Sequence, residues 1–202
     1  MAATVGRMAA RTASQSLTPE AVVTTALDVA DHEGFAAVTL ASVARRLGCH
    51  VTSLYTHVDS IDDLHTRMLL TAQSSLARSL WEAALGRSGP DALYALAGVY
   101  REFGRAHPEQ IRLLFAGATT TDSRVADGAS YMSEPVRATL RGFGLDDEQV
   151  RHAHRAFSAA IRGFAVAEAQ GAYAADADVT FDQIVDLFVQ ALESGSWPRC
   201  PA

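Results

Sequence analysis

Apolar residues recur along this chain three and four positions apart, which is the period of an amphipathic helix. The first stripe follows a helix-start signal, in which the capping residue Thr18 precedes Pro19 and Glu20. The stripe comprises Val22, Val23, Ala26, Leu27 and Ala30. This pattern predicts a helix that begins at Pro19 and stops at Gly34, with Phe35 behind it as a core residue.

Two short helices are predicted next, with Gly48 between them. The first begins at Thr39, and its apolar residues are spaced i, i+3, i+4 and i+7: Leu40, Val43, Ala44 and Leu47. The second covers residues 51–58. Isolated helices need roughly 12–15 residues to persist in water, so these two must pack on each other and on the first helix. A short helix, a glycine turn and a second short helix form the helix-turn-helix pattern.

The rest of the chain continues the helical pattern. A long helix begins at Asp59-Ser60 and runs to about Leu85, and further helices are predicted over 90–106, 108–116, 131–143, 146–170 and 180–195, with a loop over 117–128. No run of alternating β-branched residues predicts a strand. The predicted class is therefore all-α. Its expected parts are a tail (1–17), a three-helix helix-turn-helix DNA-binding domain (18–64), a larger helical ligand-binding and dimerisation domain (65–195) and a second tail (196–202).

The segment 51–58 separates into two faces when it is turned at 3.6 residues per turn. Its inward side carries Val51, Leu54 and Val58. Its outward side carries the hydroxyls of Thr52, Ser53 and Thr56, edged by Tyr55 and His57, with His50 above His57. Small hydroxyls let a helix approach a DNA groove and bond to base edges, and the edge side chains can reach phosphates, which position the helix. The alternative is that this face is only solvated.

The stretch GFAAVTLASVARRLGCHVTSLYTHVDSIDDL, residues 34–64, resembles the TetR family of transcriptional regulators. TLASVARRLG is similar to the family's second helix, and LYTHV to the end of its recognition helix. Helix order and weaker motifs such as FGRAHPEQIRLLFAG and IRGFAVAEAQG extend the likeness to about residue 195. The resemblance implies contacts to bases or backbone by Ser53 and Tyr55, and to phosphates by Tyr55 and His57. It also implies an effector that tilts the fourth helix and changes the spacing of two recognition helices.

Two positions depart from the family pattern. Ile61 stands where many members carry a lysine that grips phosphate, so Ser60 and the helix's amino-terminal N–H groups must serve there alone. His50 stands where a small residue is commoner. Nearby charges of both signs lie at Asp59, Asp62 and Asp63 and at Arg45, Arg46, Arg7 and Arg11. Operator affinity is expected to be modest, and the expected DNA contacts are Arg45, His50, Thr52, Ser53, Tyr55, Thr56, His57 and Ser60.

One short helix reads few base pairs, so two copies are expected. A twofold dimer would place its recognition helices about 34–36 Å apart, one turn of DNA. The last two long helices are the expected dimer surface, with a small-residue row at Ala156, Ala160, Gly163, Ala167 and Gly171 and an apolar row at Ile184, Leu187, Phe188, Ala191 and Leu192. The alternative is that these rows pack inside one subunit.

The larger domain also supplies aromatic residues for an effector pocket. The expected ligand-binding residues are Trp81, Phe103, Phe115, Tyr131, His154, Phe157, Ser158 and Arg162, with Tyr100 and Phe164 as further bulk. An apolar cavity with a few polar groups suits a small organic molecule. The alternative for each aromatic residue is an ordinary place in the core.

Composition narrows the function classes. The 202 residues carry a net charge of -6, which counts against nonspecific coating of nucleic acid but permits a local DNA-reading patch. No cofactor or metal is expected, because Cys49 and Cys200 match no metal or redox spacing and the seven histidines form no metal pair or catalytic triad. No segment has the apolar length of a membrane span or a signal core, which predicts a cytoplasmic protein. An enzyme is not expected, because the histidines form no catalytic pattern and the chain has no nucleophile elbow. The rival reading is a helical regulator that acts through protein contacts and has a weakened DNA-binding motif.

Overall fold

The computed structural model describes residues 17–115, 122–173 and 176–197. Within those residues it contains α-helices and one short 3-10 helix, and no strand, which confirms the all-α prediction. The elements are α1 (Pro19–Glu33), η1 (Phe35–Ala37), α2 (Leu40–Leu47), α3 (Val51–Leu54), α4 (Ile61–Ala84), α5 (Gly89–Ala106), α6 (Pro108–Phe115), α7 (Ser123–Arg141), α8 (Asp147–Ala169) and α9 (Ala177–Glu193).

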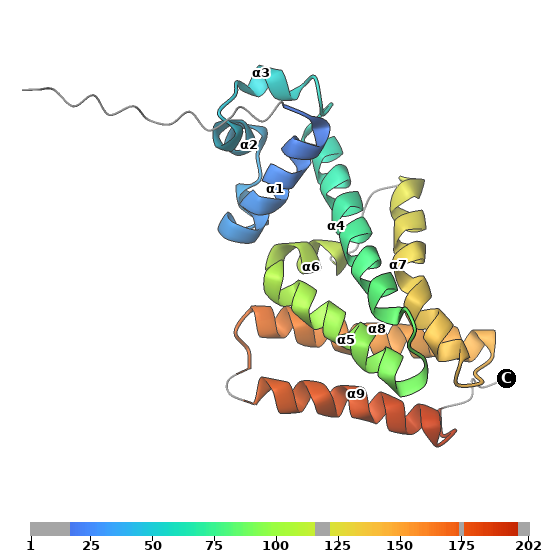
Figure 1. The fold of residues 1–202 in the computed structure, drawn as a ribbon. Helices are drawn as coiled ribbons and strands as arrows, with labels where there is room; N and C mark the ends of the chain where they lie inside the picture. The colour runs from blue at the N-terminus through green and yellow to red at the C-terminus, as the bar shows by residue number, and fades with distance from the viewer. Residues whose placement is uncertain (1–16, 116–121, 174–175, 198–202) are drawn as a thin grey trace, which may run out of the picture.

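The helices form two parts joined by α4 (Figure 1). We call α1, η1, α2 and α3 the head, and α5 to α9 the body. The long helix α4 packs on α1 in the head and on α5 and α7 in the body. At the end of the body away from the head, α8 and α9 run side by side in opposite directions. None of the described helices is long and apolar enough to cross a membrane.

Local capping signals place the head helices where the sequence predicted them. The Thr18 hydroxyl accepts a hydrogen bond from the Ala21 N–H at 3.1 Å and caps α1. Thr39 and Ser42 form a reciprocal capping box at the start of α2, with both bonds at 3.0 Å. The caps orient the apolar stripes toward one small core, whose members include Val22, Ala26, Val43, Leu54, Val58, Leu64 and Met68.

Three predicted boundaries were wrong. The loop expected over 117–128 ends earlier, because Asp122 caps the Arg124 N–H at 2.9 Å and α7 begins at Ser123. Gly128 lies inside α7 against α4, where an added Cβ would collide with the Gln73 side chain. Helix α9 begins at Ala177 rather than Thr180, and the helix expected over 51–58 is helical only to Leu54, after which a turn continues to His57.

A carboxylate ties the head to the body. Asp31, on α1, accepts hydrogen bonds from the backbone N–H groups of Glu109 (3.0 Å) and Gln110 (3.2 Å), which begin α6. It also accepts one from Gln110 Nε2 at 2.7 Å and lies 3.2 Å from Nδ1 of His107. The Asp31 side chain is 9% exposed. A residue of the head therefore caps a helix of the body, and we call this contact the Asp31 clamp.

Candidate nucleic-acid interface

The segment from α3 to the start of α4 is held by apolar anchors and short backbone turns. Gly48 ends α2 in a left-handed conformation (φ 68°), which lets the chain reverse into α3. The Leu54 carbonyl then accepts from the His57 and Val58 N–H groups at 2.8 and 3.0 Å. Leu54 and Val58 are fully buried in the head core, and Val51 is partly buried against it. The inward face predicted for this segment is thus present although the helix is shorter.

The opposite face of this segment points to solvent. Thr52, Tyr55 and Thr56 are exposed, and Ser53 and His57 are half-buried. Thr56 Oγ1 donates to the Ser53 carbonyl at 2.7 Å, so its proton is used and its methyl group and lone pairs face outward. Among the described residues, the hydroxyls of Thr52, Ser53 and Tyr55 make no hydrogen bond. These three groups are free to bond to another molecule.

Ser60 and the first turn of α4 lie beside this face. Ser60 Oγ accepts from the Asp63 N–H at 3.0 Å, which leaves the Ser60 hydroxyl proton free to donate. The Asp63 carboxylate accepts from the Asp59 N–H at 3.0 Å and from Arg67 Nε at 2.9 Å. Burial alone would raise the pKa of Asp63, but the bonds from Arg67 and Asp59 outweigh it and hold this pKa below its usual value. Asp63 is one of the three acids near the expected DNA path, and its negative charge is therefore balanced by Arg67 within α4.

The basic residues of the head differ in their availability. Arg46 forms an exposed ion pair with Glu33 on α1 at 3.3 Å. Arg45 is exposed and has no ionic partner among the residues that the structure describes. His50 is exposed at the N-cap position of α3, where its side chain makes no capping bond. Arg7 and Arg11 lie outside the described residues.

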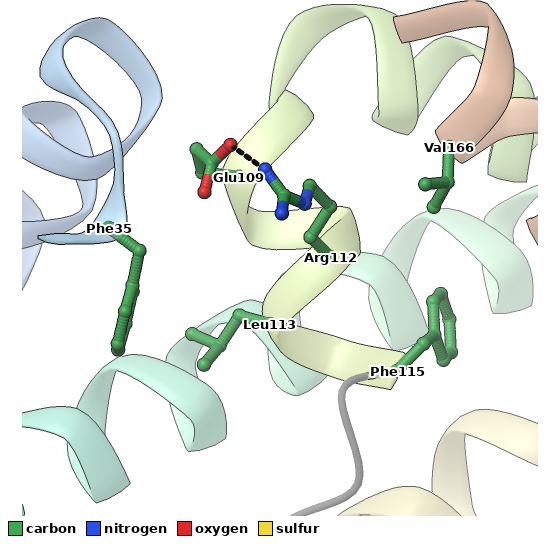
Figure 2. Close-up of a pocket in the computed structure, with 6 residues that line it drawn as sticks. All are labelled: Phe35, Glu109, Arg112, Leu113, Phe115 and Val166. Atoms are coloured by element: carbon green, nitrogen blue, oxygen red, sulfur yellow. Dashed lines mark hydrogen bonds and ion pairs between the residues drawn. The ribbon is translucent and has the colours of Figure 1, made fainter. Parts of the chain in front are cut away.

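A cavity of ≈ 370 Å³ lies at the contact between head and body, and we call it the seam cavity. Figure 2 shows Phe35 of η1 at one end and Phe115 of α6 with Val166 of α8 at the other. Leu113 and the Glu109–Arg112 ion pair (2.8 Å) also line it. Of the eight residues expected to bind an effector, Phe115 alone lines this cavity.

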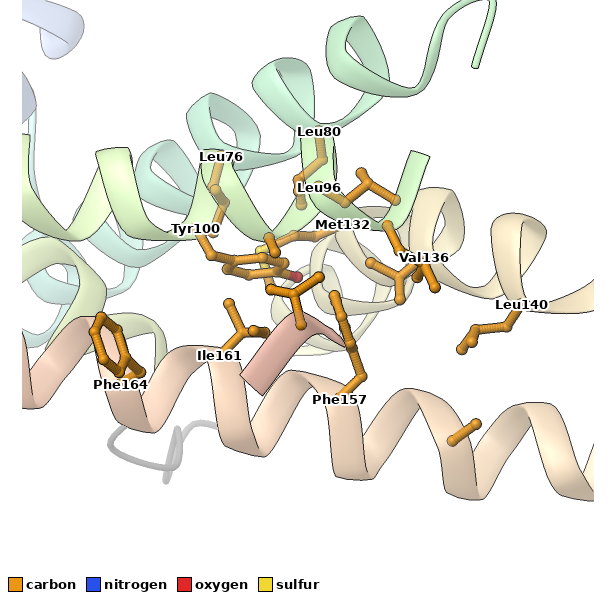
Figure 3. Packing of buried hydrophobic residues seen from close by; sticks show 14 of the residues in the cluster. Leu76, Leu80, Leu96, Tyr100, Met132, Val136, Leu140, Phe157, Ile161 and Phe164 are labelled. Atoms are coloured by element: carbon orange, nitrogen blue, oxygen red, sulfur yellow. The ribbon is translucent and has the colours of Figure 1, made fainter. Parts of the chain in front are cut away.

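The other residues of that set lie in three different environments. Phe103, Phe157 and Ser158 are buried, and Figure 3 shows Phe157 packed among the aliphatic core side chains near Tyr100. Trp81 lines a second cavity, of ≈ 310 Å³, between the end of α4 and α7, and its ring lies 5.6 Å from that of Tyr131, which is 59% exposed. His154 and Arg162 are half-buried on α8, with Phe115 beneath the Arg162 guanidinium. The structure does not bring the eight residues into one pocket.

The sequence did not point to the seam cavity or to the Asp31 clamp. Both depend on α1 and α6, whose contacting residues are 78 positions apart in the chain for Asp31 and Glu109. No local motif marks such a contact. The one available signal was Phe35, a large apolar residue directly after a helix.

Comparison with known proteins decides the family. Residues 93–188 match the model of the tetracyclin repressor-like C-terminal domain. The chain is 32% identical over 182 residues to the uncharacterized helix-turn-helix-type transcriptional regulator Rv0681 of Mycobacterium tuberculosis, which covers 88% of this chain and 82% of that protein. This chain belongs to the TetR family of transcriptional regulators. Family membership makes it a DNA-binding regulator and confirms that it is not an enzyme.

Further relatives of this TetR-family regulator agree. The uncharacterized regulator YobS of Bacillus subtilis is 24% identical, with 81% of this chain and 85% of that protein covered. The TetR-family protein ActR of Streptomyces coelicolor, solved in complex with (S)-DNPA, superposes with a TM-score of 0.62 at 20% identity, over 90% of this chain and 99% of ActR. A regulatory protein of the same family from Rhodococcus RHA1 gives a TM-score of 0.67 at 15% identity, with 88% and 98% covered. At these identities the two structures show the shared fold.

Proposed function

We propose that this regulator is a repressor that binds a palindromic operator as a homodimer and leaves it when a small-molecule effector binds. The observation that carries the proposal is the outward face of residues 52–57, which is anchored from behind by Leu54 and Val58 and has unused hydroxyl groups in front. A DNA groove offers both the base-edge acceptors and the phosphates that such groups bind.

The proposed contacts divide by side-chain position. Thr52, Ser53 and Thr56 meet base edges, and the Thr56 methyl group can contact a thymine methyl because its hydroxyl proton is already bonded. Phosphate contacts are assigned to the residues at the rim: Arg45, His50, Tyr55, His57 and Ser60. With one exposed arginine and no lysine among these residues, most phosphate bonds are neutral. We therefore expect modest affinity and a shallow salt dependence.

The outer face of α8 and α9 supports the proposed dimer. Leu187 is 68% exposed on α9, although it is a large apolar residue. On α8, Ala156 and Gly163 are exposed, and an added Cβ at Gly163 would meet nothing within 4 Å. Ile184, Phe188 and Ala191 are half-buried beside Leu187. A second copy of α8 and α9 would cover this apolar strip in a four-helix bundle.

The effector is proposed to act at the joint between head and body. ActR, a structural neighbour, was solved with the small molecule (S)-DNPA, and the seam cavity here has a volume suited to a small organic molecule. The cavity is lined by both Phe35 of η1 and Leu113 of α6, so a ligand there would press on the two parts that the Asp31 clamp joins. In this division of labour residues 18–64 read DNA and contribute Phe35 to the effector site, and residues 65–195 supply the rest of that site and the surface for the partner subunit.

A gel-shift titration tests the proposal. DNA from upstream of the protein's own coding region is titrated with protein at several salt concentrations, and the size of the free protein is measured by sedimentation. We expect a specific complex that contains two subunits and a free dimer at micromolar concentration. A protein that stays monomeric, or binds all DNA equally, would contradict the proposal and favour a regulator that acts through protein contacts. The acids at the start of α4 would favour that alternative by repelling DNA, but Arg67 balances the charge of Asp63 and weakens this argument.

A further inference from the structure

Helix α8 carries a row of polar residues inside the body. His154, Ser158 and Arg162 follow one another at intervals of four and so share one face of the helix. The next residue of the row, Val166, lines the seam cavity. The rest of the inward surface of α8 is apolar and includes Phe157, Ile161 and Phe164. Polar groups that are buried or half-buried in this way are costly unless they bind a partner, either within the protein or from outside.

Arg162 has no acidic partner among the residues that the structure describes. Its Nε donates to the Ser158 carbonyl at 2.9 Å, and its guanidinium carbon lies 4.0 Å from the ring centroid of Phe115. Within the described part of the chain, no carboxylate lies within ion-pair distance of Arg162. Arg101 on α5 shows the contrast, because its guanidinium bonds to Glu168 at 2.6 Å and to Asp178 at 2.7 Å. A half-buried guanidinium without a counter-ion is costly, because it has lost water and gained no anion.

Two neighbouring groups make this region a receptor for negative charge. Ser158 is 4% exposed, and its Oγ has no hydrogen-bond partner within the described ranges of the chain. Burial first, and then the charges of Arg137, Arg162 and Arg155, lower the pKa of His154 to about 4, so this imidazole is neutral at pH 7. Glu134 is the acid that acts on His154, and it is already bonded to Arg141 at 2.7 Å. Positive charge therefore exceeds negative charge along this face of α8.

The seam cavity supplies the apolar half of such a site. Phe115 lies beneath the Arg162 guanidinium and also lines the cavity, and Val166 lies one helical turn beyond Arg162. Arg112, which lines the cavity, is already paired with Glu109 at 2.8 Å, whereas Arg162 adjoins the cavity through its contact with Phe115. Arg162 is thus the cation beside the cavity whose charge is unmatched by the described residues.

We propose that the effector is an organic carboxylate: its anionic group pairs with Arg162, and its apolar part lies against Phe115 in the seam cavity. An arginine binds a carboxylate through two parallel hydrogen bonds, and the two Nη groups of Arg162 make no hydrogen bond to the part of the chain that the structure describes. The Ser158 hydroxyl, one turn earlier, is a second donor toward the same anion. This inference rests on the proposed function, since it assigns the chemistry of the effector that the regulator is proposed to bind.

The first test uses the full-length protein without any ligand. Arg162→Met removes the charge and keeps a long apolar side chain. Arg155→Met is the control, because Arg155 is exposed on the same helix and forms no ion pair with any described residue. An arginine kept for an external anion costs stability in the free protein. We therefore expect Arg162→Met to leave the thermal midpoint unchanged or raise it. A clear drop relative to Arg155→Met would assign Arg162 a structural role and overturn the proposal.

The second test measures binding by calorimetry. The probes are aromatic and aliphatic carboxylates of about 8 to 14 carbons, sized to the cavity, each paired with its neutral primary amide, as in 2-naphthoate and 2-naphthamide. We expect the wild-type protein to bind carboxylates at least tenfold more tightly than their amides. In Arg162→Met each carboxylate should bind no better than its amide, whereas Arg155→Met should keep the preference.

Each other outcome has a definite meaning. Equal binding of acids and amides by the wild-type protein, binding of no carboxylate in the panel, or a preference that survives in Arg162→Met would overturn the proposal. Release of DNA by amides alone would overturn it too, yet leave an effector-controlled repressor intact. Failure of the proposed function would show separately, as absence of twofold operator binding by the ligand-free protein, a property that we expect Arg162→Met to leave unchanged.

Discussion

The Asp31 clamp gives a sharp prediction about how head and body are joined. Replacing Asp31 with alanine removes the acceptor for two backbone N–H groups at the start of α6 and for Gln110 Nε2. Gln110 is 7% exposed, so little water reaches these donors once the carboxylate is gone. The substitution leaves the apolar face of α1 untouched, because Asp31 lies beside the stripe formed by Val22, Val23, Ala26, Leu27 and Ala30.

The size of the effect follows from the bonds that are lost. A hydrogen bond to a charged group contributes about 1.5–3 kcal/mol, and an N-cap about 0.5–2 kcal/mol. The bonds to Asp31 share one carboxylate, so these values do not add fully, and we expect a loss of about 2–4 kcal/mol. In a chain of this size each kcal/mol corresponds to roughly 2–4 °C in the thermal midpoint. Asp31→Asn keeps an acceptor but loses the charge, so it should cost less.

The assay is urea unfolding monitored by circular dichroism, and Asp28→Ala is the matched control. Asp28 lies on the same helix and is exposed, so its replacement should change the free energy of unfolding by less than about 0.5 kcal/mol. If Asp31→Ala also falls within that range of the wild-type protein, the carboxylate does not hold α6, and the clamp is not the joint between head and body.

Four further predictions follow from named side chains. Tyr55→Ala should weaken DNA binding by about 1–3 kcal/mol in a gel shift with unchanged circular dichroism; full affinity would remove Tyr55 from the contacts. Ile61→Lys should strengthen binding and steepen its salt slope by about one unit, and weaker binding would show that partly buried Ile61 is needed for packing. Leu187→Glu should convert the dimer into a monomer in sedimentation, whereas a persistent dimer would move the interface elsewhere. The depressed pKa of His154 (about 4) favours the neutral folded form. Above pH 6.5 the imidazole is neutral in both states, and its contribution to the free energy of unfolding is complete. As pH falls toward 4, the unfolded chain binds a proton that the folded chain does not, so this contribution is lost; unfolding measurements should show this loss in the wild-type protein but not in His154→Gln.

The sequence predicted the parts of the fold that short-range chemistry controls. Thr18, Thr39 and Ser60 each act as the cap that their residue type suggested, and the helices begin directly after them. The inward and outward faces of 51–58 were also correct, because Leu54 and Val58 are anchored whether the backbone is a helix or a turn. A four-residue periodicity sorts side chains into faces even where the hydrogen-bonded helix has ended.

Long-range placement could not be predicted from residue type. Phe103, Phe115 and Phe157 look alike in the sequence, yet Phe103 and Phe157 are buried in the core, whereas Phe115 is partly buried against it and lines the seam cavity. The pairing of Asp31 with α6 depends on which helices pack together, and so does the lack of a carboxylate beside Arg162 among the described residues. The glycine-rich composition near Gly128 suggested a loop, whereas close packing on Gln73 explains the glycine there.

Selection of binding sites from random DNA tests the central claim most directly, because it needs no knowledge of the operator. The wild-type protein is compared with a variant that carries Thr52→Ala and Ser53→Ala, which removes outward hydroxyls and leaves Leu54 and Val58 in place. We expect the wild-type protein to enrich a palindrome whose half-site centres lie about 34–36 Å apart, and the variant to lose or change the base preference within each half-site. No enriched palindrome, or the same palindrome from both proteins, would contradict DNA reading by this face.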